Sequence, residues 1–315
     1  MPINILIVGQ GAIGLLWYHH IQTLKNSNAQ HDEINLHLMS SSQAHSADAQ
    51  YSFINNVGQQ ITGKVNFAQS QQIYDADYIL LCVKSFQVSA ALNQITNKLN
   101  INAAIVLAHN GMGTINEISD AVISRHNIYA LLTTHGCLRN SPLTITHTGV
   151  GSSDLGLISG KADHNQQKTL THILSAALPD VLHHENIKLK QWLKLAINCV
   201  INPLTAINDI NNGEVNDKIF LPMKKRILAE VVNVAKFSDI NLSLDELMQR
   251  VERVAQLTAK NSSSMRCDIL AKRKSEIDYI NGYIHQLGIK YDIATPENSK
   301  LWQAVKNLET KVGTL

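Results

Sequence analysis

The stretch INILIVGQGAIG, residues 3–14, decides the fold expected for the first half of the chain. Its first six residues, 3–8, form a β-rich apolar run that ends directly in three glycines, Gly9, Gly11 and Gly14. A helical pattern follows through about Leu24. A glycine turn between a strand and a helix favours dinucleotide binding, because the free N–H groups at the helix start attract phosphate. The alternative is a glycine turn that holds no ligand.

Each glycine of this turn has a separate expected task. Gly9 permits the tight turn, Gly11 lets the backbone approach a pyrophosphate, and Gly14 allows the helix to pack closely on the strand. We therefore expect cofactor contacts along the whole loop. Its residues are Gly9, Gln10, Gly11, Ala12, Ile13 and Gly14.

The end of the next strand, expected at 34–39, indicates which dinucleotide is bound. An NAD site usually has an acidic residue there, but this chain has Met39 followed by serines at 40, 41 and 42. A 2′-phosphate would meet hydroxyl donors such as Ser40 and no repelling carboxylate, which favours NADP(H). Lys84, just past a later strand, is a candidate for the missing positive charge. Its alternative is an ordinary solvated lysine.

Strand and helix patterns alternate through the first half of the chain, which predicts a parallel sheet with crossover helices. The expected strands are 34–39, 77–83, 103–108 and 128–133, with a short one within 61–68. The expected helices are 86–99, 114–124 and 166–177, and residues 143–159 are consistent with an added hairpin.

Strand patterns end near residue 184, and helical patterns fill the rest of the chain. They cover 187–202, 214–237, 243–262 and 266–287. The fold class is therefore α/β, with a Rossmann-type NADP(H)-binding domain at 1–183 and an all-helical substrate domain at 184–315. We expect the active site in the cleft between these domains.

Three polar side chains recur every four residues in the apolar run 188–205. Lys194, Asn198 and Asn202 fall on one face of a helix, where they are able to hold and protonate a small oxygen-rich molecule. The alternative is a helix with a wet polar face. Because Pro203 disfavours helical geometry in the residue before it, we expect Asn202 at a kink or a helix end.

Composition and charge narrow the functional class. The formal net charge of +2 gives no reason to expect a nucleic-acid or membrane partner. There is no apolar run long enough for a membrane span and no signal-peptide pattern, so we expect a cytoplasmic protein. The four cysteines are widely separated, which is typical of reduced thiols. Vicinal histidines such as His19 and His20 diverge on a helix, so no metal site is expected.

The ordered set of motifs resembles the 2-dehydropantoate 2-reductase (ketopantoate reductase) family from end to end. The matching segments are the glycine turn, Val83-Lys84, His109-Asn110-Gly111-Met112-Gly113, Lys194-x3-Asn198-x3-Asn202-Pro-Leu-Thr, Asn212-Gly213, Ser263-Ser264-Met265 and Glu276-Ile-Asp-Tyr-Ile-Asn281-Gly282. The resemblance implies an oxidoreductase of pantothenate (vitamin B5) and coenzyme A biosynthesis. Such an enzyme transfers a hydride from NADPH to the C2 carbonyl of ketopantoate and yields (R)-pantoate.

The same resemblance implies roles for individual residues. Lys194 is expected as the general acid and Glu276 as the second essential residue, near both substrate and cofactor. Asn110 is expected beside the nicotinamide and the substrate. The remaining substrate-binding positions are Asn198, Asn202, Asn212 and Ser264. Outside the motif, Glu276 would be interpreted as a surface ion-pair residue and Ser264 as a helix cap.

One departure from the family concerns the cofactor. Many members carry an arginine at the end of the second strand, where this chain has Met39 or Ser40. The NADPH preference is therefore less strongly indicated than the chemistry. The alternatives are a reductase of another small 2-keto acid and a non-catalytic NADP(H)-binding regulator. A monomer and a homodimer are both compatible with the sequence.

Overall fold

The chain folds into two compact units. The computed structural model describes residues 2–27, 33–40, 48–161 and 163–311. The first unit comprises Met1–His109 and Asn116–Ile187, and the second comprises Asn110–Ile115 and Lys188–Leu315. A short segment, Asn110–Ile115, thus leaves the first unit and packs with the second.

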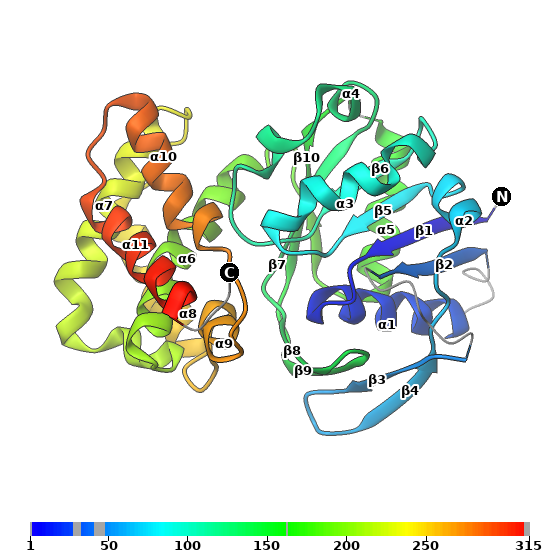
Figure 1. Ribbon diagram of the computed structural model, residues 1–315, viewed down its shortest axis with the longest axis horizontal. Helices are drawn as coiled ribbons and strands as arrows, with labels where there is room; N and C mark the ends of the chain where they lie inside the picture. Colours follow the sequence, from blue (N-terminus) through cyan, green and yellow to red (C-terminus); the bar gives the residue numbers. More distant parts are fainter. Residues whose placement is uncertain (1, 28–32, 41–47, 162, 312–315) are drawn as a thin grey trace. The chain divides into compact units, whose positions relative to one another are not determined.

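The first unit is built on a seven-stranded sheet with the order β11-β10-β7-β6-β5-β1-β2 (Figure 1). All neighbouring strands run parallel except β10, which is antiparallel to β7. The strands are β1 (Ile3–Val8), β2 (Ile34–Met39), β5 (Tyr78–Leu81), β6 (Ala104–Leu107), β7 (Ile128–Thr133), β10 (Ser153–Ser159) and β11 (Val181–His183). The predicted α/β class with a parallel sheet is confirmed.

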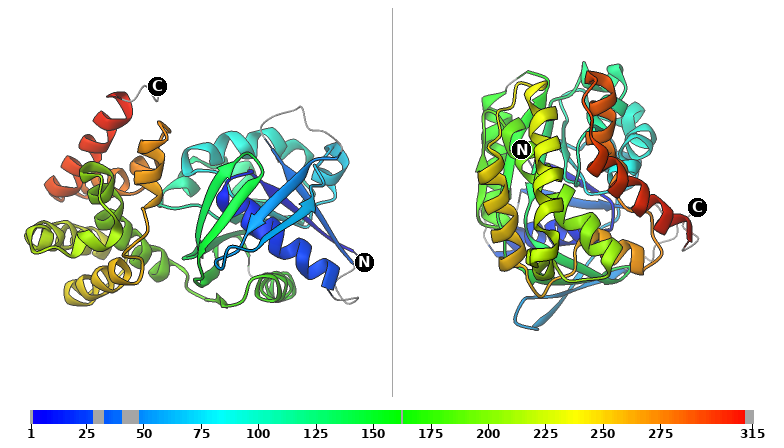
Figure 2. Two further views of the ribbon diagram at one scale, coloured as in Figure 1. Left: turned by 90° about the horizontal axis from the view of Figure 1, so that it is seen from below. Right: turned by 90° about the vertical axis from the view of Figure 1, so that its left-hand side faces the viewer.

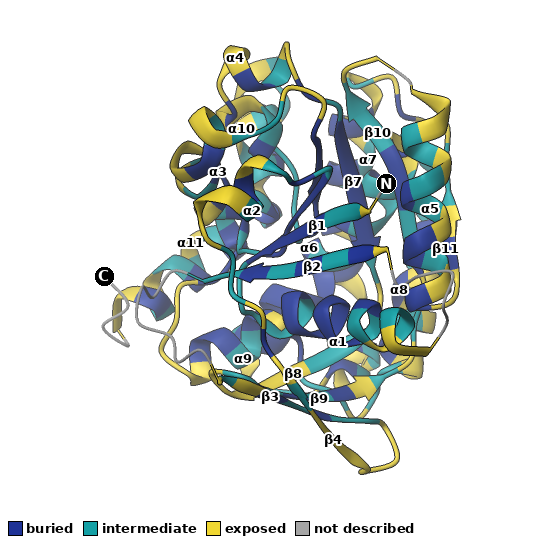
Figure 3. Ribbon diagram, turned by 90° about the vertical axis from the view of Figure 1, so that its right-hand side faces the viewer, coloured by how far each residue is buried: buried dark blue, intermediate teal, exposed yellow. Residues whose placement is uncertain are grey.

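Helices connect these strands and cover the sheet. They are α1 (Ala12–Ser27), α2 (Ser70–Tyr74), α3 (Val88–Ile95), α4 (Asp120–Ile123) and α5 (His164–Ala177). The four residues of β5 and the four of β6 are all buried, as expected for central strands covered on both faces. The neighbouring strand β7 is buried except at its last residue, and Figure 3 shows it mostly in dark blue. The single helices predicted at 86–99 and 114–124 are wrong in detail, because short 3-10 segments divide each of them.

A second sheet of four strands was not predicted. Its order is β4-β3-β9-β8, and its strands are β3 (Gln50–Ile54), β4 (Gln60–Lys64), β8 (Gly136–Ser141) and β9 (Thr144–Gly149). The predicted hairpin within 143–159 is wrong. The strand β9 pairs with the preceding β8, whereas β10 joins the large sheet beside β7.

The second unit consists of helices, and the part of it that the structure describes contains no strand (Figure 2). The helices are α6 (Lys188–Asn208), α7 (Leu221–Lys236), α8 (Leu244–Leu257), α9 (Ser264–Leu270), α10 (Asn281–Tyr291) and α11 (Pro296–Lys311). The helix α6 contacts α7, α8, α9 and α11, and it supplies Trp192, Leu195 and Val200 to the core. Among the helices described, none is both long and apolar enough to cross a bilayer.

Three helix predictions in this unit are wrong. The single helix predicted at 214–237 is divided, because 3-10 segments at Asn212–Asn216 and Lys218–Phe220 precede α7. The helix α6 does not end at Asn202 but continues through Pro203 to Asn208. Proline lacks an N–H, so the Cys199 carbonyl four residues earlier loses its helical partner. The side-chain amide of Asn281 donates to that oxygen at 3.0 Å instead. Conversely, the single helix predicted at 266–287 is interrupted, and Lys272 there has a left-handed φ of 54°.

The packing of α1 on β1 depends on a glycine at position 14. A Cβ built at Gly14 would clash severely with the Gly9 carbonyl oxygen and would also lie 3.2 Å from Cys82 Cβ. A Cβ built at Gly11 meets only the Cys82 carbonyl oxygen, at an ordinary 3.5 Å. The close approach expected of the helix and the strand is therefore present at Gly14.

We expect Gly14→Ala to lower the free energy of unfolding by about 3 kcal/mol or more, because neither backbone segment is able to move away from the added methyl group. Gly11→Ala is the matched control and should change the free energy of unfolding by less than about 1 kcal/mol. Urea titration followed by circular dichroism measures both. Equal effects of the two substitutions would contradict this account of the packing.

Candidate functional site

In the first unit, the predicted cofactor residues lie at the ends of adjacent strands. The strand β1 is flanked by β2 and β5, and the glycine loop follows β1 directly. Gly9 has a φ of 106°, and its N–H donates to the Met39 carbonyl at 2.9 Å. Ser40 after β2 and Lys84 after β5 therefore lie at the same edge of the sheet as the loop. In open α/β sheets, ligands bind outside this carboxyl edge.

Ser40 and Lys84 flank the glycine loop at the ends of β2 and β5. Ser40 and Lys84 are both half-buried. The Lys84 backbone N–H donates to Gln87 Oε1 at 3.1 Å at the start of a 3-10 turn. Ser41 and Ser42, which complete the predicted hydroxyl cluster, lie outside the described residues.

The glycine loop has polar atoms suited to a phosphate-containing ligand. Gln10 Oε1 is buried and has no hydrogen-bond partner among the described residues. Arg139 Nη1, from β8, donates to the Gln10 carbonyl at 3.1 Å and brings a guanidinium group to the loop. The N–H groups at the start of α1 and the guanidinium suit the phosphates of a dinucleotide, and the buried acceptor suits one of its hydroxyl or amide donors.

The contact from Arg139 was missed by sequence reasoning. It depends on the second sheet, which pairs β8 with β9 and carries the arginine back to a loop that is 129 positions earlier in the chain. Local patterns contain no trace of such a contact. An unassigned arginine on a strand of the nucleotide-binding half was the only available indication.

In the second unit, the structure brings Asn110 and Glu276 together. Asn110 Nδ2 donates to Glu276 Oε2 at 3.3 Å, although the residues are 166 positions apart. The Glu276 residue is only 4% exposed. It is therefore not a surface ion-pair residue, despite the lysines and the arginine just before it in the sequence.

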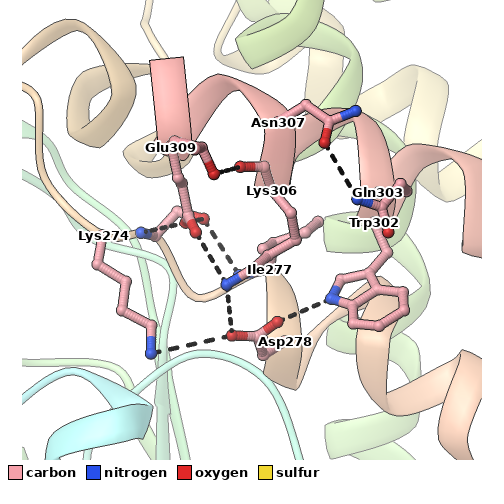
Figure 4. A network of polar contacts seen from close by, with 10 residues as sticks. Lys274, Ile277, Asp278, Trp302, Gln303, Lys306, Asn307 and Glu309 are labelled. Carbon is pink, nitrogen blue, oxygen red and sulfur yellow. Dashed lines mark hydrogen bonds and ion pairs between the residues drawn. The ribbon is translucent and has the colours of Figure 1, made fainter. Parts of the chain in front are cut away.

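The turn that carries Glu276 is held from both sides by α11 (Figure 4). Before it, the Ser275 N–H and hydroxyl both donate to Glu309 Oε1, at 2.8 and 2.7 Å. After it, the Asp278 carboxylate accepts from Trp302 Nε1 at 2.7 Å and from Lys306 Nζ at 3.2 Å. These bonds fix the backbone on either side of Glu276 and so limit where its carboxylate can point.

The loop that carries Asn110 is fitted to the same turn. The Met112 N–H donates to the Tyr279 carbonyl at 2.8 Å. Gly111 and Gly113 have φ values of 80° and 100°, and a Cβ at Gly113 would lie 2.8 Å from the Tyr283 ring. The two glycines thus allow the close approach that places Asn110 beside Glu276.

Lys194, Asn198 and Asn202, which together form the polar stripe, lie on α6. Lys194 and Asn198 are half-buried, and Asn202 is 7% exposed. Asn198 Nδ2 is buried without a hydrogen-bond partner in the described part of the chain. Because an unpaired buried amide is unfavourable, this atom is a candidate ligand contact, and an entirely wet polar face is excluded.

Asn212 and Ser264 complete the predicted set. Asn212 Nδ2 donates to Thr258 Oγ1 at 3.0 Å, and Asn212 Oδ1 is buried without a partner among the described residues. Ser264 is exposed at the first position of α9, and it is Ser263 that caps the helix by accepting from the Arg266 N–H at 3.0 Å. Ser263 is in turn hydrogen-bonded to Thr205 of α6, which leaves the Ser264 hydroxyl free of the capping role.

A cluster of histidines lies between α1 and the second sheet. His19 bonds to Tyr51, and His135 Nδ1 lies 3.2 Å from His147 Nε2. His20 faces the His147 ring at a centroid separation of 6.0 Å. Burial is the first cause that lowers the pKa of each, to about 4 for His19 and His135 and to about 3 for His20. No grouping suited to a metal ion occurs among the residues described.

These lowered pKa values predict acid sensitivity. The unfolded chain binds protons at these histidines below about pH 6.5. The folded chain does not bind them until about pH 4 to 3. Their contribution to the free energy of unfolding is therefore fully present above about pH 6.5 and is lost as the pH falls. We expect His20→Phe to reduce the loss of thermal stability between pH 7 and pH 5. His164→Gln, at an exposed position in α5, is the control. An unchanged pH dependence in His20→Phe would contradict the prediction.

Comparisons with known proteins identify relatives along the whole chain. Residues 5–160 match the sequence model described as ketopantoate reductase PanE/ApbA, and residues 186–309 match the model of its C-terminal part. The 2-dehydropantoate 2-reductase of Vibrio cholerae is 33% identical over 97% of this chain and 98% of its own length.

Solved structures share the fold. The ternary structure of D-mandelate dehydrogenase with NADH and anilino(oxo)acetate has a TM-score of 0.87 at 24% identity, with 99% of each chain covered. A PanE/ApbA family ketopantoate reductase from Ralstonia eutropha has a TM-score of 0.82 at 23% identity, with 98% of this chain and 99% of the other covered. Both halves of the sequence match one family, and the chain therefore belongs to the ketopantoate reductase PanE/ApbA family of oxidoreductases.

Proposed function

We propose that this protein reduces 2-dehydropantoate (ketopantoate) to (R)-pantoate with NADPH as the hydride donor. The observation that carries the proposal is the buried carboxylate of Glu276, which meets Asn110 in a chain whose relatives are named 2-dehydropantoate 2-reductase. A buried acceptor of this kind suits a small substrate that carries a hydroxyl group. The proposal assigns that hydroxyl to C4 of ketopantoate.

The residues of the first unit are proposed to hold NADPH. When bound, NADPH supplies the hydride for the C2 carbonyl of the substrate. The N–H groups at the start of α1 face its pyrophosphate in this proposal. The buried Gln10 Oε1 is an acceptor and is assigned to a hydroxyl or amide donor of the cofactor. Lys84, Arg139 and the Ser40 hydroxyl supply charge and hydrogen bonds for phosphate groups. The sequence directly after β2, residues 40–47, contains no acidic residue that would repel them.

Lys194 is proposed as the general acid. As negative charge develops on the C2 oxygen, an ammonium group within hydrogen-bond reach stabilises the charge and then donates its proton. Asn198, one helical turn further along α6, has an unpaired Nδ2 that is available to the same oxygen or to the carboxylate of the substrate. Asn110 is proposed to bond to the substrate while it orients Glu276.

The remaining residues are proposed to anchor the substrate. Glu276 accepts the hydrogen bond of the C4 hydroxyl, and the free Ser264 hydroxyl meets the carboxylate. Asn202 and Asn212 are proposed to line the same site, and Asn212 retains an unpaired Oδ1 for a donor. Each anchor thus matches one polar group of ketopantoate, which has a carboxylate, a carbonyl and a hydroxyl.

The proposal is tested by turnover of purified protein. We expect ketopantoate-dependent oxidation of NADPH, with kcat/KM at least about tenfold higher than with NADH, because one charge-assisted hydrogen bond to the 2′-phosphate has about that value. The absorbance of the reduced nicotinamide measures both reactions. Absence of turnover with either dinucleotide would overthrow the proposed function.

We expect Lys194→Ala to lower kcat by about 10²- to 10⁴-fold, which is the usual contribution of a general acid. Lys194→Arg keeps the positive charge but holds its proton too tightly to donate it, so it should remain slow. Lys225→Ala, at an exposed position in α7, is the control and should leave kcat unchanged. A fully active Lys194→Ala protein would contradict the assignment and favour a non-catalytic role.

We expect Glu276→Gln to reduce discrimination between ketopantoate and a branched 2-keto acid that lacks the C4 hydroxyl. The loss of a charged acceptor should lower the ratio of the two kcat/KM values by about tenfold or more. The amide keeps the size of the side chain, and circular dichroism checks that the fold is retained. If the ratio stays at the wild-type value, the C4-hydroxyl contact is wrong.

A further inference from the structure

The bond from Asn281 to α6 repairs a gap in the helix that Pro203 creates. The Cys199 carbonyl would normally accept from the N–H at position 203, which proline lacks. Asn281 Nδ2 lies 3.0 Å from that oxygen, and Asn281 is completely buried. The helix nevertheless continues for five residues beyond the proline, to Asn208.

The gap lies within the polar stripe. Cys199 directly follows Asn198, and Pro203 directly follows Asn202. Lys194 and Asn198 thus precede the gap, whereas Asn202 adjoins the proline. Proline inside a helix commonly produces a kink, and a different kink here would rotate Lys194 and Asn198 relative to Asn202. The amide of Asn281 is therefore placed where it controls the geometry of the stripe.

Asn281 is itself held in a buried polar network. Its Nδ2 also donates to Asn298 Oδ1 at 2.9 Å. Asn298 Nδ2 donates in turn to Glu230 Oε2 at 2.8 Å, and the Glu230 carboxylate accepts the backbone N–H groups of Glu297 and Asn298 at the start of α11. With its donors satisfied in this way, the orientation of the Asn281 amide is determined, because a flipped amide would turn its oxygen towards two acceptors.

The segment 275–281 carries Glu276 as well as Asn281. Only four residues separate Glu276 from Asn281, and the bonds of Ser275 and Asp278 to α11 hold the turn between them. The segment 275–281 therefore presents a carboxylate at one end and completes α6 at the other. Any shift of this segment would displace Glu276 and the polar stripe of α6 together.

We propose that Asn281 is a positioning residue that replaces the N–H missing at Pro203 and so sets Lys194 and Asn198 against Asn202 and Glu276. The proposal rests on the proposed reductase function. Asn281 touches neither substrate nor cofactor in this proposal, and it acts through the Cys199 carbonyl. Its effect is therefore removed by any change that returns an N–H to position 203.

The test is a double-mutant cycle of Asn281→Ala and Pro203→Ala. We expect Asn281→Ala alone to lower kcat by about 10- to 100-fold through misplacement of Lys194, with a smaller effect on KM. In the Pro203→Ala background, alanine 203 supplies the N–H, and Asn281→Ala should change kcat by no more than about twofold. The pH profile of kcat, which reports Lys194, should be displaced in Asn281→Ala and restored in the double mutant.

Thermal unfolding of all four proteins separates positioning from loss of fold, because each kcat is measured well below the unfolding midpoint. A double mutant as slow as Asn281→Ala would overturn the proposal, and so would a fully active Asn281→Ala protein. These outcomes are distinct from a failure of the proposed function, in which the wild-type protein itself would not turn over ketopantoate.

Discussion

The arrangement of helices in the second unit depends on a hydrogen bond to the Cys199 carbonyl oxygen. This oxygen lies in the middle of α6, the helix against which α7, α8, α9 and α11 pack, and Pro203 removes its ordinary donor. A buried carbonyl without a partner is costly, so a donor from elsewhere is needed. Asn281 supplies it, and Asn298 and Glu230 connect that amide to the start of α11. The hydrogen bonds that compensate for one missing N–H thus connect four helices, α6, α10, α11 and α7, through buried polar groups.

Much of the first unit was predictable because its determinants are local. The glycine turn after β1 and the apolar runs of β5 and β6 are each contained in a few consecutive residues, and their alternation with helices restricts the topology to a parallel sheet. The spacing of Lys194, Asn198 and Asn202 likewise placed these residues on one helix. In each case, the residues that determine the structure are close together in the sequence.

The features that escaped prediction depend on partners far away in the sequence. Pro203 disfavours a helix locally, but Asn281, 78 residues later by their numbers, allows α6 to continue. Arg139 reaches Gln10 only because β8 joins a sheet that no local pattern revealed. The burial of Glu276 is equally non-local, since basic residues precede it in sequence while Asn110 and the bonds to α11 enclose it. Sequence reasoning found the residue types, whereas only the tertiary contacts determine their environments.

Because Asn110–Ile115 belongs to the second unit, the protein cannot be cut at one position into two complete domains. The backbone passes between the units at three places, so a single cut at Ile187 does not separate two complete modules. A fragment that begins at Lys188 would lack the Met112 N–H that pairs with the Tyr279 carbonyl and the asparagine that meets Glu276. Exchange of helical halves between relatives would therefore succeed only if this six-residue insert were exchanged with them. Each unit has its own core, but neither unit is a continuous segment of the sequence that is exchangeable alone.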